Sequence, residues 1–192
     1  MLTDIIGNYQ DFVARVVSKA HGLGLNLHDF EIDHICYRCD SKSEYQQMKT
    51  ALYSADCTLL HEGMIGKRPI SVFEFNHPLQ YEQWTIRCLE LASPKPGRSH
   101  AHGLEHAEVV IGSESQGCFN SKQYLDEFVA QCPPGLDFDF KAADKELNAD
   151  VSLDLGDNIS VKFHTRPLYE VCRFEIEHGC VEPIPVDYYD TV

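Results

Sequence analysis

The feature that most constrains the fold of this sequence is an order of secondary structure that occurs twice. In the first half, FEIDHICYR (residues 30–38) alternates well enough to predict a strand, and residues 43–55 carry a helical apolar stripe. Three runs rich in branched and aromatic residues come next and predict strands: CTLLHEG, PISVFEF and QWTIRCLEL. The first half therefore predicts the order strand, helix, strand, strand, strand.

The second half repeats this order after a stretch, SPKPGRSHAHG, whose Pro, Gly and Ser content predicts a linker. LEHAEVVI predicts the opening strand, and SKQYLDEFVAQC predicts a helix with one apolar side. Three further strands fit behind that helix: ADVSLDL, ISVKFH and EVCRFEI. A repeat of this length indicates a fold built from two similar modules.

Both modules are expected to form one structural domain, because 192 residues with 43% hydrophobic content can bury a single sizeable core. Apolar residues between Thr3 and Ala20 recur at helical spacing and predict a helix that packs on its own module or on a partner. The predicted divisions are an N-terminal helical extension (1–28), the first module (29–97), the second module (98–180) and an irregular tail (181–192).

The net charge of −14 limits the classes of partner. Lys and Arg are few and scattered, so the field of the protein repels phosphate backbones and anionic lipid, which argues against nucleic acid and membrane partners. No segment is apolar for long enough to span a bilayer, and MLTDIIGNYQDF lacks a cationic stretch ahead of an apolar run. We therefore expect a cytoplasmic protein, monomer or homodimer, that acts on a small molecule.

Side chains alternate between the two faces of a strand, so the apolar neighbours of a polar residue indicate where it points. If His34 points away from the helices, Ile35 and Tyr37 point toward them, and three other strands give the same answer. The polar residues placed together on the face opposite the helices are His34, Glu90, His106 and Glu175. Burying carboxylates is costly unless a charge such as a divalent cation compensates them. Imidazole and carboxylate ligands suit zinc, nickel, cobalt, iron or manganese without selecting among them.

The register of the last strand leaves Glu170 as an alternative to Glu175. Regular alternation favours Glu175, because choosing Glu170 would turn Arg173 toward the apolar helix side, whereas a bulge would reverse the choice. Arg38 would share the inward face with His34, where it could bind a substrate carboxylate or form a salt bridge at the mouth of the curved sheet.

Four short motifs, DHICYR, LELASP, EHAEVV and FEIEHG, make the chain resemble the vicinal oxygen chelate, or glyoxalase-like, superfamily over residues 30–179. The whole chain, including the helix before the first module, is similar to the bacterial YecM group. The resemblance implies an α+β fold in which paired βαβββ modules form a curved, cup-shaped mixed sheet with helices outside. By position, it implies metal ligands on the first, fourth, fifth and last strands: His34, Glu90, His106 and Glu175. The chain departs from the superfamily's pattern before the last strand, where HTRPLYE replaces a DPxG-type turn.

The activity that the resemblance implies is that of a divalent-metal-dependent isomerase, epimerase or lyase acting on a small substrate with vicinal oxygens. The metal would act as a Lewis acid on a carbonyl, and Glu90 or Glu175 would take a proton from the neighbouring carbon and return it. An extradiol dioxygenase is one alternative, which needs two histidines and one carboxylate on iron and would be favoured if Glu90 pointed away from the site. A non-catalytic small-molecule-binding protein of the same fold is the other.

Overall fold

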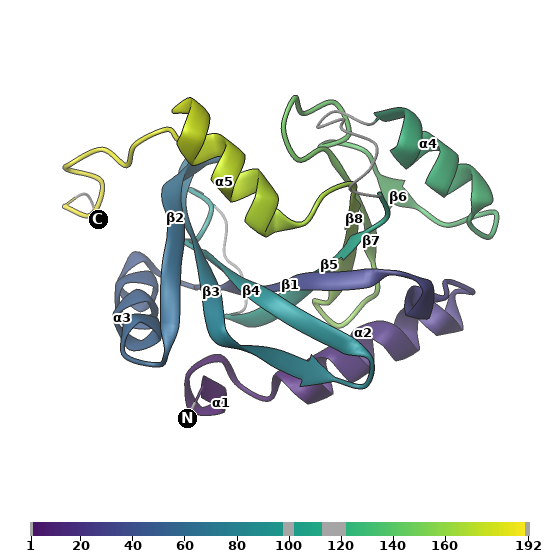
Figure 1. Ribbon diagram of the computed structural model, residues 1–192, viewed down its shortest axis with the longest axis horizontal. Helices are drawn as coiled ribbons and strands as arrows, with labels where there is room; N and C mark the ends of the chain where they lie inside the picture. The colour runs from purple at the N-terminus through teal and green to yellow at the C-terminus, as the bar shows by residue number, and fades with distance from the viewer. Residues whose placement is uncertain (1, 98–101, 113–121, 191–192) are drawn as a thin grey trace.

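The protein is built around a curved sheet of eight strands (Figure 1). The computed structural model describes residues 2–97, 102–112 and 122–190. The strands are β1 (Glu31–Arg38), β2 (Cys57–Ile65), β3 (Arg68–Tyr81), β4 (Trp84–Ala92), β5 (Gly103–Val110), β6 (Phe138–Asp139), β7 (Asp150–Asp154) and β8 (Ser160–His164). Their order across the sheet is β2-β3-β4-β1-β5-β8-β7-β6. β1 runs parallel to β4, β5 runs parallel to β8, and β1 and β5 meet antiparallel in the middle.

Two βαβββ modules make up this sheet, which confirms the predicted fold class. β1, helix α3 (Lys42–Tyr53) and strands β2 to β4 form the first module, whereas β5, helix α4 (Lys122–Gln131) and strands β6 to β8 form the second. Each module places its first strand beside its last, so the two first strands lie at the centre of the sheet. The predicted linker contains residues 98–101, which lie outside the described part of the chain.

The prediction that EVCRFEI forms the final strand is wrong, because this segment belongs to helix α5 (Leu168–His178). The buried residues of α5 are Leu168, Val171 and Cys172, which recur at the three- and four-residue spacing of a helical stripe. Gly179, in the left-handed conformation with φ of 64°, ends the helix. The strand that completes the second module is instead the two-residue β6, between α4 and β7.

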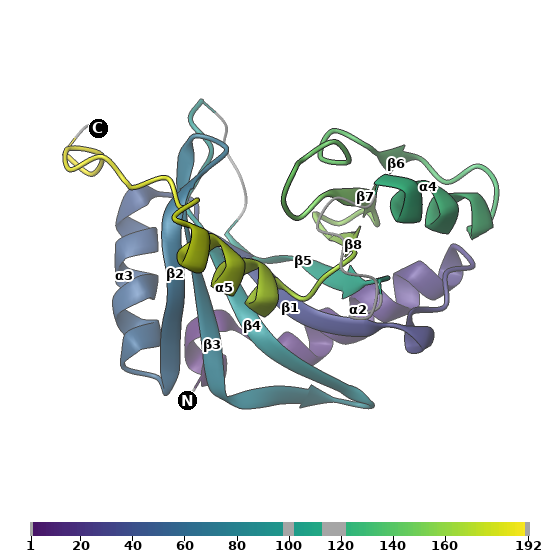
Figure 2. The same cartoon turned by 45° about the horizontal axis from the view of Figure 1, so that its top comes forward.

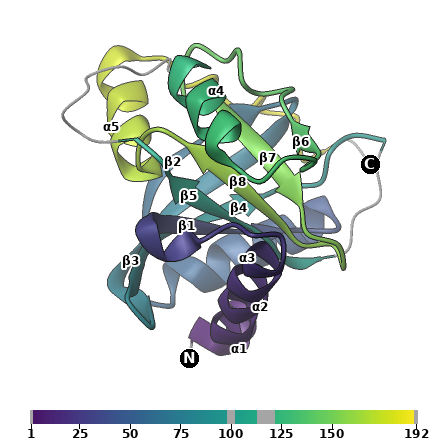
Figure 3. The same ribbon diagram turned by 90° about the vertical axis from the view of Figure 1, so that its right-hand side faces the viewer.

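Helices lie on both faces of the sheet and divide the core into an outer and an inner part (Figures 2 and 3). Helix α2 (Tyr9–Gly22), α3 and α4 cover the convex face, over the main apolar cluster. That cluster includes Ile35, Leu89, Ala107, Leu125 and Val161. α5 lies on the concave face of the first module, where Cys172 packs with Val72 and Cys88. The concave face is therefore a cup that α5 partly fills.

The N-terminal helix predicted between Thr3 and Ala20 is divided in two. α1 (Leu2–Ile6) ends before Gly7, whose φ of 84° favours glycine, and the Asn8 side chain accepts a hydrogen bond at the start of α2. α2 buries its apolar face on the sheet, and a 3-10 turn (Leu27–Asp29) leads into β1. Within the described ranges, no helix combines the length and the hydropathy needed to cross a bilayer.

Candidate metal centre

The two modules place a histidine at the same point of their first strands. His34 of β1 lies opposite Cys88 of β4, and His106 of β5 lies opposite Ser160 of β8. Both imidazoles are at most 1% exposed. The two strands are adjacent, and both rings reach one carboxylate, that of Glu108 on the concave face. The histidines predicted from separate strands are therefore brought together.

Each of these histidines is held by the acidic residue that precedes it. His34 Nδ1 lies 3.0 Å from Asp33 Oδ1, and His106 Nδ1 lies 3.1 Å from Glu105 Oε2. A carboxylate at Nδ1 fixes the proton on that nitrogen and leaves Nε2 available as a metal ligand. His34 Nε2 is buried and makes no hydrogen bond to any described residue. Both pairs thus have the arrangement of metal-binding histidines.

Both Nε2 atoms face one carboxylate oxygen, Oε1 of Glu108. This oxygen lies 3.1 Å from His106 Nε2 and 3.5 Å from His34 Nε2. It also accepts a hydrogen bond of 2.6 Å from Lys162 Nζ. One point of the cup therefore gathers two imidazole nitrogens, a carboxylate and an ammonium group.

The last strands of the two modules bring opposite charges to this point. The register pairs Glu90 of β4 with Cys36 of β1, and Lys162 of β8 with Glu108 of β5, so Lys162 holds the place in the second module that Glu90 holds in the first. Cys36 Sγ donates a hydrogen bond to Glu90 Oε1 at 3.3 Å. Ligand atoms of His34, Glu90 and Glu108 lie within 4.8 Å of one another. Glu90 therefore points into the site.

The charges of these groups stabilise one another. Burial would raise the pKa of Glu108, but Lys162 and His34 lower it well below its ordinary value. Burial would lower the pKa of His34, but Asp33 and Glu108 raise it to about 10. For Lys162, the carboxylates of Glu108 and Glu90 raise the pKa against the effect of burial. A divalent ion would compete with the proton on His34, because a ligand imidazole is neutral.

Two imidazoles and two carboxylates are a donor set that fits a divalent metal such as zinc, nickel, cobalt, iron or manganese. The residues that supply it are His34, Glu90, His106 and Glu108. The buried Nε2 of His34 supports this fit, because it makes no hydrogen bond within the described ranges and faces Glu108 Oε1 only at 3.5 Å. The residues present could hold such an ion at the bottom of the cup.

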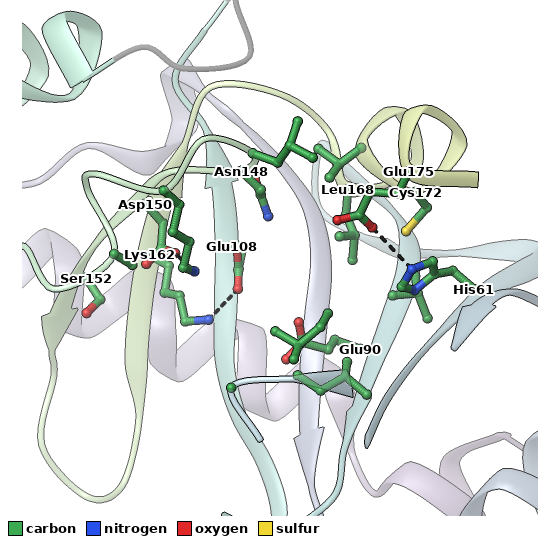
Figure 4. Close-up of a pocket in the computed structure, with 18 of the residues that line it drawn as sticks. His61, Glu90, Glu108, Asn148, Asp150, Ser152, Lys162, Leu168, Cys172 and Glu175 are labelled. Atoms are coloured by element: carbon green, nitrogen blue, oxygen red, sulfur yellow. Dashed lines mark hydrogen bonds and ion pairs between the residues drawn. The ribbon is translucent and has the colours of Figure 1, made fainter. Parts of the chain in front are cut away.

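The centre opens into a cavity of about 540 Å³ on the concave face (Figure 4). Figure 4 shows Glu108 and Lys162 on the side of the second module, while Cys172 and Glu175 of α5 face His61 of β2 on the other side. A small molecule in this cavity would contact both sides, so α5 forms one wall of the candidate site.

Glu175 does not join the two histidines, because α5 carries it to the other side of the cavity. Its Oε2 lies 3.2 Å from His61 Nε2, and burial raises its pKa. Glu170, the alternative ligand, is in the first turn of α5, with its Oε2 at 3.8 Å from Arg166 Nη1. The assignments of Glu175 and Glu170 as ligands both assumed that this segment is a strand, whereas it is helix α5. The carboxylate that lies beside the two histidines is instead that of Glu108.

Arg38 forms a salt bridge with Glu105. Its Nε donates to Glu105 Oε2 at 2.6 Å, and its Nη2 bonds the same oxygen. Of the two roles that the sequence left open, the structure has the salt bridge, which supports His106 through Glu105. The arginine that lines the cavity is Arg68 of β3, whose Nε and Nη1 are buried without a hydrogen-bond partner in the described ranges.

Alternation along the strands contains a signal for two of the residues that sequence reasoning missed. In EHAEVV, Glu108 falls on the same face as His106, and in ISVKFH, Lys162 falls on the face opposite its apolar neighbours. His61 has no such signal, because the pairing of β2 with β3 shifts register between Leu59 and His61. Alternation, applied to every polar residue of these strands, therefore predicts Glu108 and Lys162 on the concave face but not His61.

Comparisons with known proteins agree with this fold. The family model described as YecM protein matches residues 1–175. The Escherichia coli (strain K12) protein YecM is 30% identical over 60% of this chain and 61% of its own length, and a Haemophilus influenzae protein is 24% identical over 57% of each. The alignments thus span about three fifths of these curated relatives. A solved structure titled Protein EC4020 is 24% identical, with 91% of this chain and 92% of that chain covered and a TM-score of 0.71.

Proposed function

The chain belongs to the YecM family. We propose that it is a divalent-metal-dependent enzyme of the vicinal oxygen chelate type, acting on a small substrate with vicinal oxygens. The proposed ligands are His34, Glu90, His106 and Glu108, with Glu108 taking the place first assigned to Glu175. The proposed reaction is a proton transfer next to a carbonyl, as in an isomerase, epimerase or lyase.

One observation carries this proposal: two histidines at equivalent positions of the modules direct Nε2 at the same point. Each has a carboxylate on Nδ1, at 3.0 Å for His34 and 3.1 Å for His106. A purely structural role would not require a carboxylate on Nδ1 of the histidine in each module. It would also not require both Nε2 atoms to face the same point. Metal-ligating histidines need both, because the outer carboxylate sets the tautomer and the orientation of the ring.

A metal at this point would supply Lewis acidity toward a substrate carbonyl. Glu90 lines the cavity, and we propose that its carboxylate takes a proton from the carbon beside that carbonyl and returns it. Lys162, whose Nζ is 2.6 Å from Glu108, adds fixed positive charge where a substrate oxygen becomes negative. Two carboxylates beside the histidines favour this chemistry over a dioxygenase, whose iron needs one.

The proposed substrate is an anion. Five basic residues line the cavity: Arg68, Lys95, Lys141, Lys145 and Lys162. They balance the formal charge of the five acidic residues in the same wall, although the whole protein carries a net charge of −14. Arg68 is 5% exposed and has two guanidinium nitrogens without hydrogen-bond partners among the described residues. We therefore propose that Arg68, in place of Arg38, binds a carboxylate of the substrate.

Metal binding is tested by elemental analysis of protein purified without a tag, and by melting temperature with each of the five candidate ions. We expect His34→Ala, His106→Ala and Glu108→Gln each to lower the metal content by about one equivalent per chain. Glu170→Gln is the matched control, because Glu170 lies outside the centre and should leave the content unchanged. Unchanged metal content in both histidine variants would contradict the proposal.

Proton transfer is tested by NMR, from the incorporation of deuterium at the carbon beside the carbonyl of pyruvate and oxaloacetate in D₂O. The metal-loaded protein should speed this exchange over buffer with the same metal. Glu90→Gln should lower the rate by about 100-fold or more, since a positioned general base contributes on that order. Glu74→Gln is the control, because Glu74 lies outside this cavity and pairs with Arg87. Equal exchange by Glu90→Gln and wild type would refute the assigned role.

A second candidate function is the metal-free binding of a small anion. The observation that favours it is Lys162, an ammonium group at the position of the second module that corresponds to Glu90. The same measurements separate the two functions. Binding of oxalate by calorimetry, with no bound divalent ion and no exchange activity, would support the metal-free function.

A further inference from the structure

His61 is a buried histidine whose two ring nitrogens make no hydrogen bond to any described residue. Its side chain is 3% exposed. Nε2 lies 3.2 Å from Glu175 Oε2, but the contact does not have the geometry of a hydrogen bond. A buried polar group left without a hydrogen bond is destabilising. The ring therefore has unused binding capacity beside the cavity.

Cys172 and Glu175 approach His61 from one face of α5, because residues three apart in a helix are neighbours. Figure 4 shows the sulfur of Cys172 and the carboxylate of Glu175 directed at the imidazole. One ligand atom from each of the three residues lies within 4.8 Å of the others. Two ligands of a tetrahedral zinc ion are about 3.4–3.6 Å apart, close to the 3.2 Å between His61 Nε2 and Glu175 Oε2.

We propose that His61, Cys172 and Glu175 form a second metal site, separate from the two-histidine centre, and that it binds zinc. Thiolate with imidazole selects zinc over magnesium, calcium or manganese. Three protein ligands leave a fourth position, as in catalytic zinc sites. All three residues line the cavity, so that position faces the space where a substrate oxygen or a water would bind.

α5, which carries Cys172 and Glu175, is held to the sheet near both of its ends, at β1 and at the β2 strand that carries His61. Asp33 of β1 accepts a hydrogen bond from the first residue of α5, Leu168 N, at 2.6 Å. Beyond the helix, Met64 N of β2 donates to Glu182 O at 2.8 Å. Gly63 permits this contact, since a Cβ there would lie 3.0 Å from Glu182 O. The spacing of the three ligands is thus fixed by the fold, as a preorganised metal site requires.

The second site does not depend on the proposed function, because it shares no ligand with His34, Glu90, His106 and Glu108. It also gives Glu175 a role that its position on α5 allows. The two sites differ in one way that can be measured directly, since the second includes a thiolate. Cobalt bound to a thiolate has a charge-transfer absorption in the near ultraviolet, which cobalt bound to nitrogen and oxygen alone lacks.

The test uses the full chain, stripped of metal and titrated with Co²⁺ and with Zn²⁺. We expect a thiolate-to-cobalt band in the wild type, and a second zinc equivalent by elemental analysis. Cys172→Ser should abolish the band and remove about one zinc equivalent, and Glu175→Gln should weaken Co²⁺ binding at this site by about tenfold or more. Glu175→Gln keeps the size of the side chain, so it reports on the site even where the cysteine variant folds poorly.

Two control variants make the outcome specific. Cys88→Ala changes a buried thiol in the same apolar cluster, outside the three-ligand group, and should keep the band. Cys36→Ala changes the thiol beside Glu90 and should also keep it. His106→Ala should remove the zinc equivalent of the two-histidine centre without removing the band. The experiment therefore distinguishes failure of the proposed function from failure of this second site. A wild type without the band, or a band that survives Cys172→Ser, would overturn the inference.

Discussion

Asp33 of β1 caps the helix that begins at Leu168. Its Oδ2 accepts a hydrogen bond of 2.6 Å from Leu168 N, while its Oδ1 lies 3.0 Å from His34 Nδ1 and 3.0 Å from His164 Nε2. The residue before the helix, Pro167, makes no side-chain capping bond. One buried carboxylate thus orients a proposed metal ligand and fixes the start of the helix that forms one wall of the cavity.

Asp33→Asn should therefore lower both stability and metal affinity. The amide of Asn has one accepting oxygen where Asp33 uses two, so the histidines and the helix end would compete for one acceptor. We expect the free energy of unfolding to fall by about 3 kcal/mol, the cost of breaking a buried charged network. Metal affinity should fall by about tenfold or more, as for other outer carboxylates of ligand histidines. Urea unfolding and metal titration measure the two effects.

Asn8→Ala is the matched control for this prediction. Asn8 caps α2 at the surface, where its side chain accepts from Asp11 N at 3.1 Å. Loss of an exposed cap costs about 1 kcal/mol, and it should leave metal affinity unchanged. Equal metal affinity in Asp33→Asn and Asn8→Ala would show that Asp33 acts on the fold alone.

Lys162→Met should make the protein less stable without metal and more responsive to it. The variant leaves Glu108, which is 3% exposed, without its 2.6 Å partner, so the metal-free melting temperature should fall. It also removes a positive charge that competes with a metal ion for the same carboxylate. The rise in melting temperature on adding metal should therefore exceed that of the wild type.

Lys145→Met provides the comparison for Lys162→Met. Lys145 also lines the cavity, and its Nζ is 2.9 Å from Asp150 Oδ2, but its side chain is 50% exposed. Its loss leaves Asp150, which is 6% exposed, without this partner, so the metal-free melting temperature should fall, but the response to metal should stay that of the wild type. If metal raises the melting temperature of Lys162→Met no more than that of Lys145→Met, Glu108 is not a ligand.

Arg68 and Arg38 should respond in opposite ways to the same substitution. Burial and the charge of Arg38 lower the pKa of Arg68, whose Nε and Nη1 have no partner in the described ranges. Arg68→Met should therefore raise the free energy of unfolding by about 1 kcal/mol, since it removes a desolvated polar group. Arg38→Met should lower it by about 2 kcal/mol, because Glu105, which is partly exposed and also bonded to His106, loses its guanidinium partner.

Arg68 and Arg38 should also differ in their contribution to anion binding. Oxalate affinity, measured by calorimetry, should fall by about tenfold or more in Arg68→Met, which loses a charged hydrogen-bonding partner. A stability loss in Arg68→Met as large as that in Arg38→Met would mean that Arg68 has a structural role.

The first module could be predicted closely because one face of each strand packs on a helix. FEIDHICYR was expected at residues 30–38, and β1 spans Glu31–Arg38. Ile35 and Tyr37 are in the convex core, as alternation requires when His34 lies on the concave face. The same logic placed Glu90 and His106 in the cup, so three of the four predicted ligands lie at the candidate centre.

The end of the second module could not be predicted, because the local pattern there is ambiguous. In EVCRFEI, the apolar residues Cys172, Phe174 and Ile176 alternate as in a strand, yet Ile176 is 53% exposed on the helix. The strand that the sequence did not predict, β6, has two residues, too few to show a period. The cap that starts α5 comes from Asp33, 135 residues earlier, and no local pattern contains it.

The half-buried ion pair of Lys49 and Glu62 should make stability depend on pH below neutrality. Lys49 Nζ lies 2.8 Å and 3.0 Å from the two Glu62 oxygens, and Tyr45 donates to Oε1 at 2.8 Å. Burial would raise the pKa of Glu62, but the bonds from Lys49 and Tyr45 lower it below its ordinary value. A carboxylate with a lowered pKa stabilises the fold above its unfolded value, and this stability is lost as pH falls through the folded value.

Lys49→Met should therefore cost about 1 kcal/mol of unfolding free energy at pH 7, since each side chain is 20% exposed and solvent screens the pair only in part. The difference from wild type should shrink as pH falls from about 5 to 3, because protonated Glu62 no longer attracts Lys49. Lys141→Met, whose partner Asp139 is at the surface and whose side chain is 88% exposed, should show no measurable difference at either pH. Urea unfolding across this range measures the effect, and a difference that stays constant with pH would exclude Glu62 as its source.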